Sequence, residues 1–259
     1  MMKTMLLLLF FCILLAPVSI FASEQVVTID TRQGVTMKLL LVSPETQTDK
    51  AMIMFPGASG YRHFSSDEGA ISKGRNFLVR TSPDFARKGF LVAVVDSPSD
   101  RKGMDDNFRT SKEHLQDISK AVDYLTDKGY KSIYLIGTSM GTISAAYIGA
   151  ELKNPAIKGV ILTSTMSYSR YLRWISLDKT PYPVLIVHHK EDDCKAVNSY
   201  SEASRMTRVF KNSPKVDFVG VSGGQFPQSD PCESLSPHGY FGIENEVIDK
   251  IANWIFSSY

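Results

Sequence analysis

The stretch that decides the fold is SIYLIGTSMGTISAAYIGAE, residues 132–151. It opens with an apolar run, Ile133–Ile136, of the kind that forms a buried strand. The next five residues, GTSMG at 137–141, place Ser139 between two glycines, and a run of small residues follows at helical spacing. This pattern predicts a sharp strand-to-helix turn that presents Ser139, because the residues two positions away must be almost free of side chain. A helix that begins there also directs backbone N–H groups at the serine, which suits a nucleophile.

Similar apolar runs recur along the chain, with helical patterns between them. We expect strands at Val26–Ile29, Met37–Val42, Ala51–Phe55, Leu91–Val95, Ile133–Ile136, Gly159–Leu162, Val184–Val187 and Val216–Val219, and helices at Ser111–Asp127, Gly141–Glu151, Ser199–Phe210 and Glu244–Phe256. This alternation predicts an α/β fold with a mostly parallel, twisted sheet of about eight strands and helices on both faces. Residues 163–183, between two of the strands, are too few for a large cap domain.

Composition limits the classes of function. The chain has 259 residues, of which 43% are hydrophobic, enough for one domain with a sizeable core. Charged residues make up 22% and the formal net charge is +2, without a basic tract. Nucleic acid is therefore not an expected partner.

The N-terminus has the pattern of a secretory signal. Lys3 precedes the apolar run Met5–Leu15, which is too short to span a bilayer, and Ala22 suits a signal peptidase. We expect residues 1–22 to be a signal peptide and residues 23–259 to be the mature domain. The protein is then exported, periplasmic or secreted, without stable membrane insertion after cleavage.

A serine nucleophile needs a base and an acid. His238 follows the last expected strand, and it alone among the histidines comes after every candidate acid, as the order serine, acid, histidine requires. Asp192 follows the strand Val184–Val187 and is the preferred acid. Asp193 is its close competitor and Glu191 a more distant one. The acid would hold the imidazole in the correct tautomer.

The oxyanion of the reaction needs backbone N–H donors. One is expected from Met140, the residue after the nucleophile, and the other from the small-residue loop Phe55–Gly60. Ala58 is the preferred donor of that loop and Gly57 the alternative. A phosphate-binding loop would carry Lys and Ser or Thr after its glycines, and this loop does not.

These residues together resemble the α/β-hydrolase superfamily over nearly the whole mature chain. More narrowly, the chain resembles uncharacterised bacterial secreted serine hydrolases. The matching segments are Phe55–Gly60, Asn76–Arg80, Asp96–Arg101, Gly137–Gly141, His188–His189 with Asp192 and Cys194, and Cys232 before His238-Gly239. The resemblance implies the fold and hydrolase chemistry but no substrate. The loop reads Pro56-Gly57-Ala58 where many members of the superfamily carry His-Gly-Gly.

The expected activity is hydrolysis of carboxylic esters through an acyl-enzyme, without a metal or other cofactor. Two alternatives stay open: a peptidase or amidase with the same three residues, and a non-catalytic binding protein on a hydrolase scaffold. The site is expected to be uncapped, partly covered by residues 58–81 and lined by aromatic side chains such as Tyr168, Tyr171 or Trp174.

Two cysteines remain after removal of the signal with Cys12. Cys194 lies two residues after Asp192, and Cys232 lies six before His238. Because Asp192 and His238 must meet, the cysteines are brought close together, and export provides oxidising conditions. We therefore expect a Cys194–Cys232 disulfide.

Overall fold

The computed structural model describes residues 23–64 and 74–257. The predicted signal peptide, residues 1–22, lies outside these ranges. The strands are β1 (Glu24–Arg32), β2 (Val35–Val42), β3 (Lys50–Phe55), β4 (Leu91–Pro98), β5 (Ser132–Ser139), β6 (Ile157–Thr165), β7 (Val184–His189) and β8 (Val216–Val221). Within the described ranges, the helices are α1 (Phe77–Arg80), α2 (Ser82–Arg87), α3 (Asp106–Arg109), α4 (Lys112–Asp127), α5 (Gly141–Glu151), α6 (Tyr200–Arg205) and α7 (Glu244–Ser257).

The strands form one eight-stranded sheet in the order β1-β2-β4-β3-β5-β6-β7-β8. β1 pairs with β2, and β2 with β4, in antiparallel fashion, and the remaining pairs are parallel. The predicted mostly parallel sheet is confirmed. β5, which ends at Ser139, lies near the middle, between β3 and β6. Loops at the carboxyl ends of these strands therefore meet around Ser139, as expected for an open α/β sheet.

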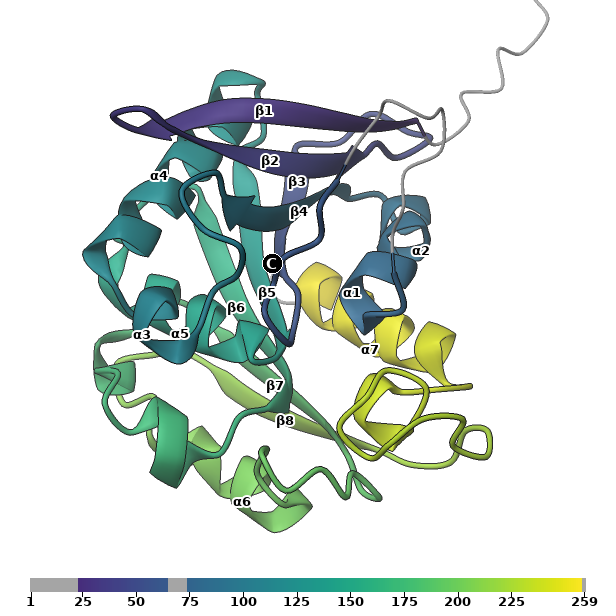
Figure 1. Cartoon of the computed structure of the whole chain (residues 1–259). Coiled ribbons are helices and arrows are strands. Elements are labelled where there is room, and N and C mark those ends of the chain that lie inside the picture. Colours follow the sequence, from purple (N-terminus) through teal and green to yellow (C-terminus); the bar gives the residue numbers. More distant parts are fainter. Residues whose placement is uncertain (1–22, 65–73, 258–259) are drawn as a thin grey trace, which may run out of the picture.

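Helices cover both faces of the sheet (Figure 1). On one face α4, α5 and α6 pack through residues such as Ile118, Ile148 and Ala203. On the other face α1, α2 and α7 pack through residues such as Leu78 and Ile251. The central strands are buried on both sides, which explains their continuous apolar sequences.

The helix predicted for Ser199–Phe210 is shorter than expected. Ser199 caps α6 through a capping box with Glu202, and after Arg205 the chain tightens into a 3-10 turn, Met206–Arg208. The helices α1, α2 and α3 were not predicted, because segments of four to six residues are too short to show helical periodicity.

The segment between β6 and β7 contains only a π-helical turn, Tyr168–Leu172, and a 3-10 turn, Leu177–Lys179. No cap domain is inserted there, as predicted. Within the described ranges, no helix combines the length and apolar character needed to cross a membrane.

Candidate active site

Ser139 stands at the junction of β5 and α5 in a left-handed backbone conformation, with φ of 52°. Such a conformation is unfavourable for a residue with a side chain and persists only where the surroundings impose it. The two flanking glycines are needed sterically. A Cβ atom on Gly137 would lie 2.3 Å from the carbonyl oxygen of Gly141, and one on Gly141 would lie 1.9 Å from that of Phe55. The strand, turn and helix therefore form the predicted sharp turn.

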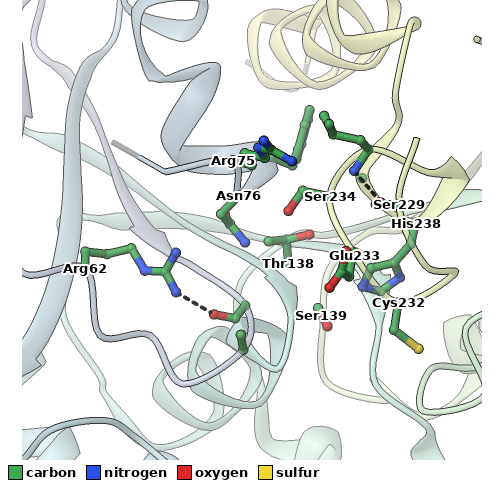
Figure 2. A pocket seen from close by; sticks show the side chains of 15 residues that line it. Arg62, Arg75, Asn76, Thr138, Ser139, Ser229, Cys232, Glu233, Ser234 and His238 are labelled. Atoms are coloured by element: carbon green, nitrogen blue, oxygen red, sulfur yellow. Dashed lines mark hydrogen bonds between the residues drawn. The ribbon is translucent and has the colours of Figure 1, made fainter. Parts of the chain in front are cut away.

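Ser139 and His238 line the same cavity, which has a volume of about 380 Å³ (Figure 2). In this structure the Ser139 hydroxyl lies 3.9 Å from the sulfur of Met166 and makes no hydrogen bond to any other described residue. The hydroxyl is thus free to turn toward His238 when a ligand enters, and such contacts are commonly loose before a ligand binds.

His238 pairs with Asp192. Its Nδ1 atom lies 3.0 Å from Oδ2 of Asp192, whose side chain is wholly buried. The second carboxylate oxygen of Asp192 accepts a hydrogen bond from the amide of Cys194 at 3.1 Å. Asp193 and Glu191 are exposed, and the Glu191 carboxylate lies 3.0 Å from His189 instead. Of the three acids considered, Asp192 alone contacts His238. The Nδ1 contact leaves Nε2 of His238 for the cavity.

The backbone around His238 is fixed by hydrogen bonds that the sequence did not reveal. The Ser164 hydroxyl donates to the His238 carbonyl at 2.8 Å, and the Ser164 amide donates to the Tyr240 hydroxyl at 2.9 Å. That hydroxyl donates in turn to the carbonyl of Val187 at 2.9 Å. Arg80 donates to the carbonyl of Gly239 at 2.7 Å. The loop that presents His238 is therefore tied to β6, β7 and α1.

The loop after β3 approaches Ser139 closely. A Cβ atom on Gly57 would lie 2.9 Å from the Cβ atom of Ser139, and Ala58 has a positive φ of 53°. The backbone amides of Ala58 and Met140 donate no hydrogen bond to any residue in the described ranges. Within the described ranges, both predicted donors are thus available beside Ser139, as the expected oxyanion role requires.

A buried arginine, Arg109, donates hydrogen bonds to the backbone of this loop. Arg109 is fully buried, and its Nη2 atom donates to the carbonyls of Pro56 at 3.3 Å and Ala58 at 3.1 Å. Its Nε atom donates to Met104 O at 3.1 Å, and its Nη1 atom to the Ser144 hydroxyl on α5 at 2.8 Å. Burial, with a smaller contribution from a neighbouring arginine charge, lowers the pKa of Arg109 to about 9.

The other histidines do not share the cavity with Ser139. His189 contacts the carbonyl of Gly223 at 2.9 Å. His114 and His188 are buried, and burial lowers their pKa values to about 3 and about 4. Both are therefore neutral at neutral pH. His63 contacts the Tyr61 hydroxyl.

The predicted aromatic lining is wrong. Tyr168 and Trp174 border a separate hollow, and Tyr171 packs against the core. After β6, Met166 forms an isolated bridge with Val197, and the π-helical turn Tyr168–Leu172 that follows does not line the cavity. The apolar lining of the Ser139 cavity comes from Phe77 and Leu235 instead.

The expectation that residues 58–81 partly cover the site is supported by their described part, which lines the cavity, but the individual polar side chains were not predicted. The chain before α1 contributes Arg62, Arg75 and Asn76, and the segment before His238 contributes Ser229, Cys232, Glu233 and Ser234. These residues lie in irregular segments, where no periodicity or motif indicates which side chains face a site. In the described part of the chain, no three His, Cys, Asp or Glu side chains are grouped to bind a metal ion.

The predicted disulfide is present. Cys194 and Cys232 are joined, with their Cα atoms 4.6 Å apart and a sequence separation of 38. Cys194 follows Asp192 closely and Cys232 precedes His238. The bond therefore ties the segment that carries the acid to the segment that carries the histidine.

Solved structures with this arrangement of strands and helices include several hydrolases. A cold-adapted esterase from an Arctic intertidal metagenomic library superposes with a TM-score of 0.60 at 13% identity, covering 90% of this chain and 94% of that chain. An alpha-beta serine hydrolase homologue from Coxiella burnetii gives a TM-score of 0.62 at 15% identity, over 88% and 96%. An esterase of Pyrococcus furiosus gives 0.59 at 16%, over 88% and 91%. The chain has the α/β-hydrolase fold.

The sequence matches no protein-family model and no curated protein. At identities this low the α/β-hydrolase fold is what the similarity shows. The chemistry has to be argued from the side chains around Ser139.

Proposed function

We propose that this protein is a serine hydrolase that cleaves carboxylic esters through an acyl-enzyme. One observation carries the proposal: Ser139, on a strained turn, shares a cavity with a histidine whose Nδ1 atom is paired with the buried carboxylate of Asp192. A histidine without a catalytic role does not require a buried carboxylate partner, and a serine without one does not require a strained backbone conformation. The esterases among the structures with the same fold support the same class of reaction.

In the proposed cycle, Nε2 of His238 takes the proton of Ser139 as the serine oxygen attacks the ester carbonyl. Asp192 holds the neutral imidazole in the tautomer with the proton on Nδ1 and stabilises the imidazolium that forms. The amides of Met140 and Ala58 stabilise the oxyanion. His238 then gives its proton to the alcohol that leaves. Water, deprotonated by the same histidine, releases the acid from Ser139.

A fluorophosphonate probe and an ester panel test the proposal. The mature protein is expected to be labelled at Ser139 and to hydrolyse short-chain para-nitrophenyl esters. Ser139→Ala should remain folded, escape labelling and lose on the order of 10⁴-fold in turnover. Ser201→Ala, which alters an exposed serine on α6, is the matched control and should retain both properties.

Aminoacyl-amide substrates run in parallel separate the esterase from an amidase. Cleavage of amides at rates equal to those of matched esters would replace the proposed reaction by peptidase or amidase chemistry. A folded Ser139→Ala protein with normal turnover would refute the role of the serine. Failure of the wild-type protein to be labelled would favour a binding protein.

We infer that the protein is exported by a signal peptide at residues 1–22. The disulfide between Cys194 and Cys232 supports this inference, because such bonds persist in oxidising compartments. N-terminal sequencing of the protein from the periplasm or medium should begin at Ser23. Protein that stays in the cytoplasm with its N-terminus intact would contradict export.

A further inference from the structure

The cavity beside Ser139 is positively charged on one side. Arg62 and Arg75 reach it from the chain between β3 and α1, and Asn76 lies between them and the serine (Figure 2). The two guanidinium groups can only donate hydrogen bonds, and the Asn76 side chain donates through its amide nitrogen. The proposed ester hydrolysis uses none of them.

Arg62 forms no ion pair with a carboxylate of residues 23–64 or 74–257. Its Nη2 atom lies 3.4 Å from the carbonyl of Gly57, a long contact, and its Nε atom is buried without a partner in the described ranges. Asp96 accepts hydrogen bonds from the backbone amides of Arg62 at 2.6 Å and Phe64 at 3.1 Å and forms no ion pair with the guanidinium. Burial lowers the pKa of Arg62, with Asp96 opposing the shift. A partly buried cation that forms no ion pair with a described residue, and that only the charge of Asp96 opposes from nearby, is incompletely compensated until an anion reaches it.

Asn76 and Arg75 add donors at the same place. Oδ1 of Asn76 accepts a hydrogen bond from the amide of Leu78 at 3.1 Å, which fixes the side-chain amide. Its Nδ2 atom then lies 3.4 Å from where a Cβ atom on Gly57 would stand, close to the nucleophile. The Arg75 side chain is exposed at the rim and has no partner in the part of the chain that the structure describes.

One acidic side chain, Glu233, lines the opposite side of the cavity. It is exposed and belongs to the segment that carries the disulfide, beside His238 (Figure 2). The lining thus holds two arginines and one glutamate, and the two signs are on different sides. On the side formed by Arg62 and Arg75, no carboxylate is among the described lining residues, so this side favours anions.

We propose that this cavity selects small esters that carry a carboxylate, which Arg62 and Arg75 bind while Ser139 attacks the ester carbonyl. This inference rests on the proposed hydrolase activity and names its substrate class. Guanidinium groups bind carboxylates with two parallel, charge-assisted hydrogen bonds. Asn76 provides a third donor. A cavity of about 380 Å³ suits short substrates such as monoesters of small dicarboxylic acids.

Two matched pairs of esters test the selectivity. In the first pair the charge is on the acyl group: the para-nitrophenyl monoester of glutaric acid is compared with uncharged para-nitrophenyl pentanoate. In the second pair the charge is on the alcohol: para-acetoxybenzoate is compared with its methyl ester. The wild-type protein should show a higher kcat/KM for the charged member of at least one pair, and added salt should reduce this preference.

Variants of Arg62 assign the preference to the cavity. Arg62→Gln should lose at least about tenfold more kcat/KM on the charged ester than on its uncharged match, mainly through KM. Arg62→Lys keeps the charge and should restore part of the preference. Arg87→Gln, which alters an exposed arginine on α2, is the matched control and should change neither rate. Equal losses on both esters would overturn the proposal.

A binding measurement separates this proposal from the hydrolase activity. Calorimetry of Ser139→Ala with monomethyl glutarate should show binding that Arg62→Gln weakens at least about tenfold. Hydrolysis without charge preference, together with no such binding, overturns the anion site and leaves the hydrolase intact. Binding that depends on Arg62, in a protein that cleaves no ester and is not labelled at Ser139, supports the anion site and refutes the hydrolase.

Discussion

Removing the disulfide between Cys194 and Cys232 should cost both stability and turnover. The bond closes a loop of 38 residues, and the chain-entropy relation gives a stabilisation of about 4 kcal/mol at 25 °C for a loop of that length. In Cys194→Ala/Cys232→Ala the unfolded chain regains this freedom, so the free energy of unfolding should fall by about that amount. For a domain of this size the melting temperature should fall by roughly 10 °C.

The same variant should be slower where it is still folded. The amide of Cys194 donates to Asp192, and Asp192 pairs with His238 at 3.0 Å, so loosening this segment disturbs the acid and the base together. Because small misplacements of reacting groups cost rate, we expect kcat for a neutral ester to fall about tenfold or more, with a smaller change in KM.

Urea unfolding measures the loss of stability, and ester kinetics well below the melting temperature measure the loss of turnover. Apart from the control below, both are carried out without reductant. The wild-type protein treated with dithiothreitol is the control and should approach the alanine variant in both. A variant with wild-type stability would show that the bond adds nothing to the fold. A variant that is less stable but fully active when folded would refute the link between the bond and the acid–base pair.

Three further substitutions test the scaffold. Arg109→Met removes the side chain that donates to two carbonyls of the loop after β3. In protein shown by circular dichroism to be folded, kcat/KM should fall on the order of 10²-fold, and an unchanged kcat/KM would contradict a role in positioning the loop. Gly141→Ala places a Cβ atom 1.9 Å from the carbonyl oxygen of Phe55, so the free energy of unfolding should fall by about 3 kcal/mol or more, and a normal melting temperature would show that the turn can relax. Burial keeps His114 neutral in the folded protein with a pKa of about 3, whereas the unfolded chain takes up the proton below pH 6.5, so stability falls as the pH falls. Between pH 6.5 and pH 5, the free energy of unfolding of His114→Leu should therefore fall by about 2 kcal/mol less than that of the wild-type protein, as measured by urea unfolding at each pH. An unchanged pH dependence would show that this histidine does not titrate in that range.

The fold and the centre of the candidate site were predictable for the same reason. Buried parallel strands are continuously apolar, and the turn at Ser139 admits only glycine at positions 137 and 141. Chain order then singled out His238, and the structure places it against Asp192 rather than Asp193. The choice between neighbouring acids needed the structure, because adjacent residues of a loop point in different directions.

The lining of the cavity could not be predicted in this way. Tyr168 and Trp174 follow β6 in sequence, yet they border a separate hollow. Residues 58–81 were expected to cover the site, but the irregular pattern of this segment does not show that Arg62 and Asn76 face the cavity. Sequence periodicity reports which face of an element is buried, whereas the path of an irregular segment depends on distant contacts. Arg109 illustrates the same limit, since its four partners come from three separate parts of the chain.

The position of Arg109 limits which sequence changes around Ser139 can be tolerated during evolution. One guanidinium spans the loop that bears Ala58 and the helix α5 that begins just after Met140. The separation between the amides of Ala58 and Met140, the two donors of the proposed mechanism, is therefore fixed partly by this side chain and not by the sheet alone. Insertions or substitutions in residues 56–60 have to preserve this span or arise together with a change at position 109. If Arg62 and Arg75 select the substrate as proposed, they are freer to vary, because neither guanidinium donates a hydrogen bond to α5.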